Sequence, residues 1–448
     1  MQTLPSFILA HLQPFRFIFF TNKTYLKAAL LLTGILMCRG ARTVCSILKV
    51  LGLKGETAFA KYHHVLNRAK WDILQASKIL LEQIDHDQSE PLKLVIDGHL
   101  ERRRGDMISA KGAYRDAVQS SKNYIVVSSG LKWLCVMAVK KFSWCKRPLA
   151  LPFLTVLTPN EEYNKKNKKR HKTLQDWTCQ IIMQIRRWFP NRKIIFIADN
   201  EFATAGIALR CLMYNISFVS RLKLNARLFD FPFKNHRGRP RNKGMRLPTI
   251  EAILSDPTII WVTEEVSWYG GCKKDVQYFT GTCLWHVMSE SSSPIPIRFV
   301  LVKSINNKSK PVLLMSTDLE LSPKEIIETY VERWNIEVTF HEAREHLGIE
   351  TQRQWSDKAI ARTTPILFGL YSLVILIGKQ LIQLGKIEVE QTAWYTKEEI
   401  KFSDILRGVR KLLLEEMYFC KDVFLEQPLE KSDRNFIDRV IDLFLHAA

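Results

Sequence analysis

KLVID at residues 93–97 and KIIFIAD at residues 193–199 are short apolar runs that each end in an aspartate. Each has the length and composition of a buried β-strand, so Asp97 and Asp199 are expected at two strand ends. The surrounding sequence alternates between strand-like and helix-like patterns: strands at 123–129, 132–139 and 216–222, a glycine turn at Gly130, and helices at 173–188 and 202–213. This alternation predicts an α/β core whose active site lies at the strand termini.

Changes of pattern divide the 448 residues into five regions. We expect a helical DNA-binding region at 1–88, the first part of the core at 89–222, a β-rich antiparallel insertion at 223–320, the second part of the core at 321–385, and a C-terminal helical region at 386–448. Within the last two regions, helices are predicted at 366–384, 397–420 and 432–446.

The N-terminal region contains the outline of a helix-turn-helix. Residues 42–50 and 57–69 have helical spacing, and the glycine-containing break LGLKGE (51–56) separates them. The second helix and its end carry Lys61, Arg68 and Lys70, which can reach phosphates and base edges. The alternative is the solvated face of an ordinary helical bundle.

The segment YVERWNIEVTFHEAREHLG (330–348) belongs to a helix predicted over 323–347, with Ser322 as its cap and Gly348 at its end. Four polar side chains fall within roughly 60° of one face of this helix: Tyr330, Arg333, Glu337 and Arg344. A phenol, two guanidiniums and a carboxylate suit a face that grips phosphate and binds metal. The alternative is a surface helix with an Arg333–Glu337 ion pair.

Asp97, Asp199 and Glu337 together would form an oxygen-only ligand set. Taken singly, each acid has an ordinary explanation as a turn or cap residue. Converging from two strands and a helix, the three carboxylates favour Mg²⁺ or Mn²⁺. Two such ions can assist the in-line displacement of a phosphodiester.

The net charge of +21 indicates a polyanionic partner. Three segments carry the whole excess: residues 1–71, 164–172 and 234–246. We therefore expect three regions that bind DNA phosphates, unless the two loops are only solvated surface. The candidate contacts in these loops are Lys168, Lys169, Arg170, Arg237, Arg239 and Arg241.

An anionic membrane is the weaker candidate for that partner. The longest apolar stretch, 365–378, is shorter than the roughly 20 residues of a spanning helix. The nine cysteines are widely spaced and include no CxxC pair, which is typical of free thiols in a cytoplasmic protein.

The 330–348 segment resembles the Y-(2)-R-(3)-E-(6)-K signature of the IS4-type DDE transposases, with Arg344 where that family usually carries lysine. Other stretches resemble the IS701 branch: IDGHLERRRGDMISAKGAYRDAVQSSK, PFLTVLTP, ADNEFA, WYGG, TGTCLWH, LLMSTDLELSP and TQRQWSDKAIARTTP. The similarity extends from about residue 40 to 410.

This resemblance implies an RNase H-like catalytic core interrupted by a β-rich insertion. It implies that Asp97, Asp199 and Glu337 bind two metal ions, and that Tyr330, Arg333 and Arg344 contact phosphates near the cleaved DNA end. Some relatives flip a base onto an aromatic side chain of the insertion. The candidates for that role, which are more readily explained as strand-packing residues, are Trp261, Trp268 and Trp285.

We therefore expect a DNA transposase that cuts transposon ends at the terminal inverted repeats and joins them to target DNA. It would act in the cytoplasm on double-stranded DNA, as a homodimer in a synaptic complex, with Mg²⁺ or Mn²⁺. Two alternatives remain: an RNase H-like nuclease without strand transfer, and a non-catalytic DNA-binding protein derived from a transposase.

Overall fold

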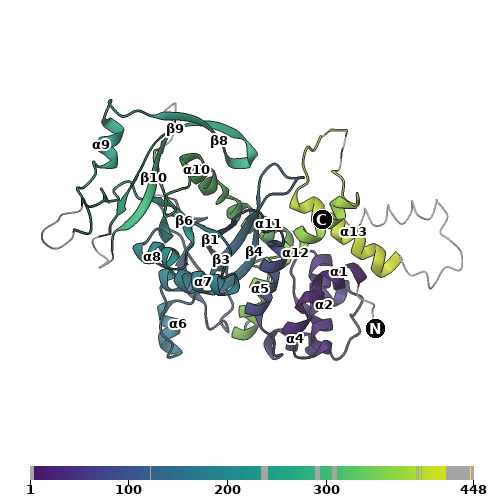
Figure 1. Cartoon of the computed structure of the whole chain (residues 1–448). Helices are drawn as coiled ribbons and strands as arrows, with labels where there is room; N and C mark the ends of the chain where they lie inside the picture. Colours follow the sequence, from purple (N-terminus) through teal and green to yellow (C-terminus); the bar gives the residue numbers. More distant parts are fainter. Residues whose placement is uncertain are drawn as a thin grey trace.

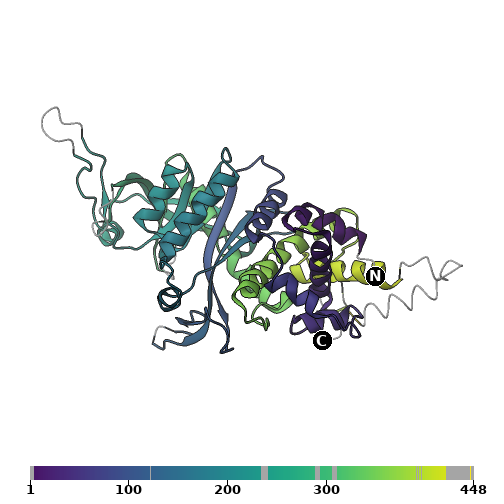
Figure 2. The same ribbon diagram turned by 90° about the horizontal axis from the view of Figure 1, so that it is seen from below.

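The computed structural model describes residues 5–121, 123–233, 241–287, 293–304, 310–389, 391, 393–394, 396–419 and 444. Figures 1 and 2 show a lobe built on a large sheet beside a lobe of helices. The helices are α1 (Ser6–Leu12), α2 (Asn22–Met37), α3 (Val44–Val50), α4 (Ala60–Asn67), α5 (Ile73–Ile84), α6 (Glu161–Lys166), α7 (Leu174–Trp188), α8 (Ala205–Met213), α9 (Ile250–Ser255), α10 (Pro323–Glu332), α11 (Asn335–Leu347), α12 (Asp357–Gln383) and α13 (Phe402–Leu414).

The strands are β1 (Leu92–Arg102), β2 (Gly112–Arg115), β3 (Val127–Lys140), β4 (Leu149–Leu157), β5 (Ile194–Ala198), β6 (Ser217–Leu222), β7 (Leu228–Phe229), β8 (Val262–Ser267), β9 (Lys273–Trp285), β10 (Ile295–Lys303) and β11 (Val312–Ser316). Short helical turns lie at Gln13–Ile18 (η1), Asn200–Phe202 (η2), Tyr269–Gly271 (η3) and Glu415–Phe419 (η4).

The centre of the sheet is the run β4-β3-β1-β5-β6. Strands β4, β3 and β1 pair antiparallel, whereas β1, β5 and β6 pair parallel. Beyond β6 the same sheet continues through β11, β10 and β9, all antiparallel. The strands of the 223–320 segment therefore extend the central sheet.

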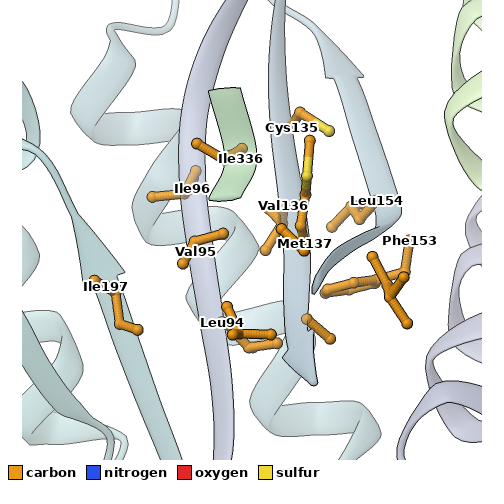
Figure 3. Packing of buried hydrophobic residues seen from close by; sticks show 14 of the residues in the cluster. Leu94, Val95, Ile96, Cys135, Val136, Met137, Phe153, Leu154, Ile197 and Ile336 are labelled. Carbon is orange, nitrogen blue, oxygen red and sulfur yellow. The ribbon is translucent and has the colours of Figure 1, made fainter. Parts of the chain in front are cut away.

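The central strands are buried on both faces, which explains their unbroken apolar sequences. Leu94, Val95 and Ile96 of β1 lie between Ile197 of β5 and the β3 side chains Cys135, Val136 and Met137 (Figure 3). The helix α11 contacts this layer, with Ile336 close to Ile96 in the same view. Burial of these side chains fixes the sheet beneath the acids.

Two strand predictions need correction. β1 does not end at Asp97 but continues to Arg102, because its second half pairs with β3 after the parallel partner β5 has ended. Gly130 is not a turn but lies inside β3, where it pairs with Arg102. A Cβ at Gly130 would overlap the carbonyl oxygen of Glu101, so glycine permits a close approach of two backbones.

Helices from both ends of the chain form the helical lobe. α12 contacts α4, α5 and α13, and α13 also contacts α2 (Figure 2). Long-range hydrogen bonds reinforce this packing: Arg410 of α13 donates to the Leu36 carbonyl at 2.7 Å. The N-terminal and C-terminal helical regions are thus neighbours in space.

The helix α12 is longer than the 366–384 helix that was predicted. It begins at Asp357, and its 27 residues, with an 18-residue window of mean hydropathy 1.8, would allow it to cross a membrane. However, 67% of its most apolar window is buried within the protein, as in the core helix of a lobe. The predicted helix at 432–446 lies outside the described residues, apart from position 444.

Candidate active site

Two of the three acids lie side by side because of strand register. In the parallel pair β1–β5, Ile96 is opposite Ala198, so Asp97 and Asp199 follow at equivalent positions on adjacent strands. The Ser220 hydroxyl of β6 donates to the carbonyls of Ala198 and Asp199, which holds the end of β5. The pairing therefore places both carboxylates at one edge of the parallel part of the sheet.

The third acid comes from a helix that is interrupted. The segment predicted as one helix is divided into α10 and α11 at Arg333 and Trp334, where successive backbone N–H groups bond to carbonyls three residues earlier. Such tight turns change the direction of the chain. Tyr330 at the end of α10 and Arg333 in the turn contact the aspartates, and Glu337 in α11 contacts Arg333.

Arg333 links the acids directly. Its Nη1 lies 3.2 Å from Oδ2 of Asp97, and its Nη2 lies 3.4 Å from Oε1 of Glu337. The Tyr330 hydroxyl donates to Oδ1 of Asp199 at 3.1 Å. Asp97, Asp199 and Glu337 thus form one cluster with Arg333 and Tyr330. The Arg333–Glu337 ion pair, which the sequence offered as an alternative explanation, is part of this cluster.

Burial perturbs the titratable groups of this cluster. The pKa of Asp97 is raised to about 6, mainly by burial; Arg333 opposes this rise, and the carboxylates of Asp199 and Glu337 add smaller upward effects. Burial also raises the pKa of Glu337 and of the Tyr330 phenol. Perturbed carboxyl groups that share a site are typical of functional centres.

The chemistry of these donors fits a hard divalent cation. All three ligands are carboxylates, and a cation would relieve the mutual repulsion and the desolvation of Asp97. In the described part of the chain, no group of three or more His, Cys, Asp or Glu side chains is arranged to hold a metal ion, and Arg333 lies between Asp97 and Glu337. Metal binding here would require the Arg333 guanidinium to move away from them.

Three residues near the cluster were not singled out from the sequence. Arg221, at the end of β6, places Nε 3.8 Å from Oδ1 of Asp199. Tyr269 and Trp334 are 42% and 46% exposed, and their rings are 5.8 Å apart. The pKa of Tyr269 is raised by burial, with smaller effects of Arg333 and Glu337, so this ring lies beside the acids. The sequence signal for Arg221 was its position near the end of the third predicted strand, 216–222.

The tryptophans proposed for base stacking occupy different environments. Trp285 is 4% exposed within the core and has no free face for a base, so that prediction is not supported. Trp261 and Trp268 are partly buried, and each ring is covered by a lysine, Lys303 at 3.8 Å and Lys274 at 4.6 Å. Trp268 and Lys274 line a cavity of about 190 Å³ that also reaches Tyr330.

Arg344 does not join the acid cluster. Its Nε pairs with Glu350 at 3.1 Å, and Arg102 pairs with the same carboxylate at 3.3 Å. Arg102 also binds Asp116 at 2.7 Å, and Arg103 binds the buried Glu101 at 2.7 Å. Much of the arginine-rich run after Asp97 is therefore engaged within the protein.

The residues proposed to contact phosphates differ in solvent exposure and in ion pairing. Arg68, Lys70, Lys168, Lys169, Arg170 and Arg241 are exposed. Lys61 is held in an ion pair with Glu56 at 2.5 Å. Arg237 and Arg239 lie outside the described residues.

Among solved structures, this chain is similar to the cryo-EM structure of a piggyBac transposase synaptic complex with hairpin DNA, with a TM-score of 0.43 and 12% identity over 95% of this chain and 76% of that one. No curated protein matches. The model of the DDE superfamily endonucleases matches residues 17–275, which include Asp97 and Asp199 and end before Glu337. Because this match spans more than half of the sequence, the chain belongs to the DDE superfamily endonucleases.

Proposed function

We propose that this DDE superfamily member is a DNA transposase of the IS4 type, in the IS701 branch, that cuts transposon ends and joins them to target DNA. The observation that carries the proposal is the convergence of Asp97 and Asp199 from adjacent parallel strands with Glu337, bridged by Arg333. The strand run β4-β3-β1-β5-β6, with its antiparallel and parallel halves, supports an RNase H-like core. The strands from β7 to β11 would be its insertion.

Asp97, Asp199 and Glu337 would hold two Mg²⁺ or Mn²⁺ ions. When bound, such ions supply a water activated for attack and stabilise the leaving oxygen of a phosphodiester. Arg333 would be freed from the carboxylates as they become neutralised, and its guanidinium fork would then suit a DNA phosphate. Tyr330 and Arg344 are the further proposed phosphate contacts, and Arg221 is a new one on the same edge.

Double-stranded DNA is the proposed substrate, both as terminal inverted repeats and as target. The exposed cations Arg68 and Lys70 after α4, and Lys168, Lys169 and Arg170 after α6, support phosphate binding. Trp261 and Trp268, which flank β8 at its two ends, remain candidates for contact with a displaced base. A homodimer in the synaptic complex and a cytoplasmic location complete the proposal.

The test uses oligonucleotides that carry the inverted repeats flanking this gene, with Mg²⁺ and a target plasmid. The wild type is expected to nick at the repeat end and to join the freed 3′ end to the plasmid. Asp97→Asn, Asp199→Asn and Glu337→Gln should reduce nicking to background while still binding the repeat. Asp256→Asn, which replaces an exposed aspartate, is the matched control.

The products separate the competing functions. Nicked repeats without joined plasmid would indicate a nuclease that lacks strand transfer, the reading that the family's description as endonucleases favours. Binding without nicking would indicate a non-catalytic DNA-binding protein. Normal nicking by any of the three acid variants would contradict the site.

A further inference from the structure

A second cleft lies between α4 and the extended segment 353–356 that follows α11. Its volume is about 180 Å³, and none of the three acids Asp97, Asp199 and Glu337 lines it. One wall is the face of α4 formed by His63, Leu66 and Asn67, at helical spacing. The other wall contains Arg353, Gln354 and Trp355. We call this site the α4 cleft.

The walls of the α4 cleft are held in place by the core. Arg362 of α12 donates to four backbone carbonyls at the end of α4, those of Val65, Leu66, Ala69 and Trp71, at 2.9–3.3 Å. On the other side, Gln352 donates to Thr364 at 3.2 Å, and Arg103 donates to the Gln354 carbonyl. The cleft therefore exists before any ligand binds.

Two polar atoms of the cleft lack a partner among the described residues. Oδ1 of Asn67 and Oε1 of Gln354 are buried, and neither accepts a hydrogen bond from any described residue. A buried amide oxygen without a donor costs free energy, so the cleft favours a ligand that brings N–H groups. Both oxygens belong to residues that line the cavity.

An aromatic face and basic groups accompany these acceptors. Trp355 is 59% exposed, and Arg353, next but one along the extended segment, is exposed as well. Arg68, Lys70 and Lys358 are exposed too. They lie near the cleft, since Lys358 donates a hydrogen bond to the Arg68 carbonyl at 3.3 Å, just after the end of α4. An aromatic platform beside cations is the combination that binds unpaired bases and their phosphates.

We propose that the α4 cleft binds an unpaired nucleobase of DNA that carries an exocyclic amino group. The base stacks on Trp355, its amino group donates to the amide oxygens of Asn67 and Gln354, and the surrounding cations contact the adjoining phosphates. Adenine, cytosine and guanine have such an amino group, whereas thymine has none. This inference rests on the proposed DNA function and adds to it a site that selects the base.

The probe is a 20-base-pair DNA duplex with a single bulged adenine, compared with a bulged thymine and with the fully paired duplex. Binding to the full chain is measured by fluorescence anisotropy without divalent metal. We expect the bulged adenine to bind most tightly. Trp355→Ala should weaken binding of the bulged adenine by roughly 5- to 150-fold, the range of stacking losses, and leave the paired duplex unchanged.

Matched variants isolate stacking from folding and from charge. Trp355→Phe should retain most of the affinity, and Asn67→Ala should reduce the preference for adenine over thymine. Trp394→Ala, which removes a tryptophan that is 87% exposed elsewhere, should change nothing. Equal thermal unfolding of Trp355→Ala and the wild type shows that the fold is intact.

Three results would overturn the proposal: no preference for a bulge, a Trp355→Ala variant that binds as the wild type does, or an equal loss on paired and bulged DNA. Nicking of plasmid in Mg²⁺ by the wild type and by Glu337→Gln is measured in parallel. If the wild type does not nick but its bulge preference depends on Trp355, the proposed catalysis fails and the cleft stands. If the wild type nicks the plasmid but its bulge preference does not depend on Trp355, the proposed catalysis stands and the base-binding role of the cleft fails.

Discussion

The Arg333 guanidinium holds together carboxylates that would otherwise repel one another. It is buried in the turn between α10 and α11 and bridges Asp97 and Glu337. Even so, the pKa of Asp97 is raised to about 6, so desolvation and the neighbouring acids outweigh this one cation. A site with uncompensated charge costs stability, which is common where function requires it.

Asp97→Asn is expected to stabilise the protein in the absence of divalent metal. The folded chain holds the Asp97 proton more tightly than the unfolded chain, whose aspartate has an ordinary pKa near 3.8. Ionisation therefore destabilises the fold as the pH rises from about 4 to above 6. Asparagine does not ionise, so the free energy of unfolding should rise by about 1–3 kcal/mol at pH 8 and change little at pH 4.

Urea denaturation at the two pH values measures this difference. Asp256→Asn provides the control, because hydrogen bonds from Thr258 lower the pKa of that exposed aspartate, and its replacement should not stabilise the fold at pH 8. A gain for Asp97→Asn that is the same at pH 4 and pH 8 would contradict the assignment of the effect to ionisation.

At the level of elements, the close approach of β1 and β3 depends on one glycine. The sequence pattern alone predicted a turn at Gly130, because a glycine between two strand-like runs usually marks a turn. In the folded chain the two runs form one strand, and Gly130 allows it to pass beside the Glu101 carbonyl. The Glu101 side chain beneath it accepts hydrogen bonds from Arg103, Trp133 and Thr364.

Gly130→Ala should therefore destabilise the protein by about 1–3 kcal/mol, since the added methyl group forces the paired backbones apart. Gly98→Ala, on the same strand pair, is the matched control: its Cβ would have only ordinary contacts, the nearest at 3.9 Å. That variant should be neutral or slightly stabilised, because alanine restricts the unfolded chain. Equal unfolding midpoints in urea for the two variants would exclude the close approach as the cause.

The connection between α12 and α4 is a second element-scale feature. Arg362 donates to four carbonyls and lies 4.2 Å from the Trp71 ring. Arg362→Met would leave these carbonyls without their donor, at a cost of about 2–4 kcal/mol. Amide hydrogen exchange in residues 60–71 should become faster than in the rest of the chain. Lys358→Met, which removes one exposed hydrogen bond, should have no such local effect.

At the scale of the whole molecule, the positive charge is divided among separate surfaces. The segment after α6 exposes Lys168, Lys169 and Arg170, whereas Arg68 and Lys70 lie in the helical lobe. Both lobes therefore present cations to a polyanion. A DNA duplex that contacts both would release counterions from each, which makes its binding strongly dependent on salt.

Replacing Lys168, Lys169 and Arg170 by glutamine should weaken binding of any DNA sequence and flatten its salt dependence. If all three contact phosphates, the slope of log K against log salt should fall by up to about 2.7. The control replaces Lys193, Lys379 and Lys386, exposed lysines outside the three basic segments, and keeps the same net charge. Identical slopes for the two triple variants would make the segment after α6 merely solvated surface.

Much of this protein follows from its sequence alone. The buried strands of KLVID and KIIFIAD, the helix at 174–188 and the polar residues near Glu337 are local patterns, which depend on neighbours within one element. Local patterns also sufficed to select Asp97, Asp199 and Glu337 for one site, before the register of β1 and β5 was known. The location of the excess charge is likewise a property of the chain itself.

Only the tertiary structure decided how these elements meet. Helical periodicity placed Arg344 on the face of Glu337, but Arg344 lies two turns further along α11, where Glu350 takes its guanidinium as an ion-pair partner. No local pattern could pair Asp97 with its neighbour 102 positions along the chain, place Gly130 inside a strand, or bring Trp355 beside α4. The reason is physical: sequence periodicity records which face of an element is buried, whereas the partner of that face is chosen by packing of the whole chain.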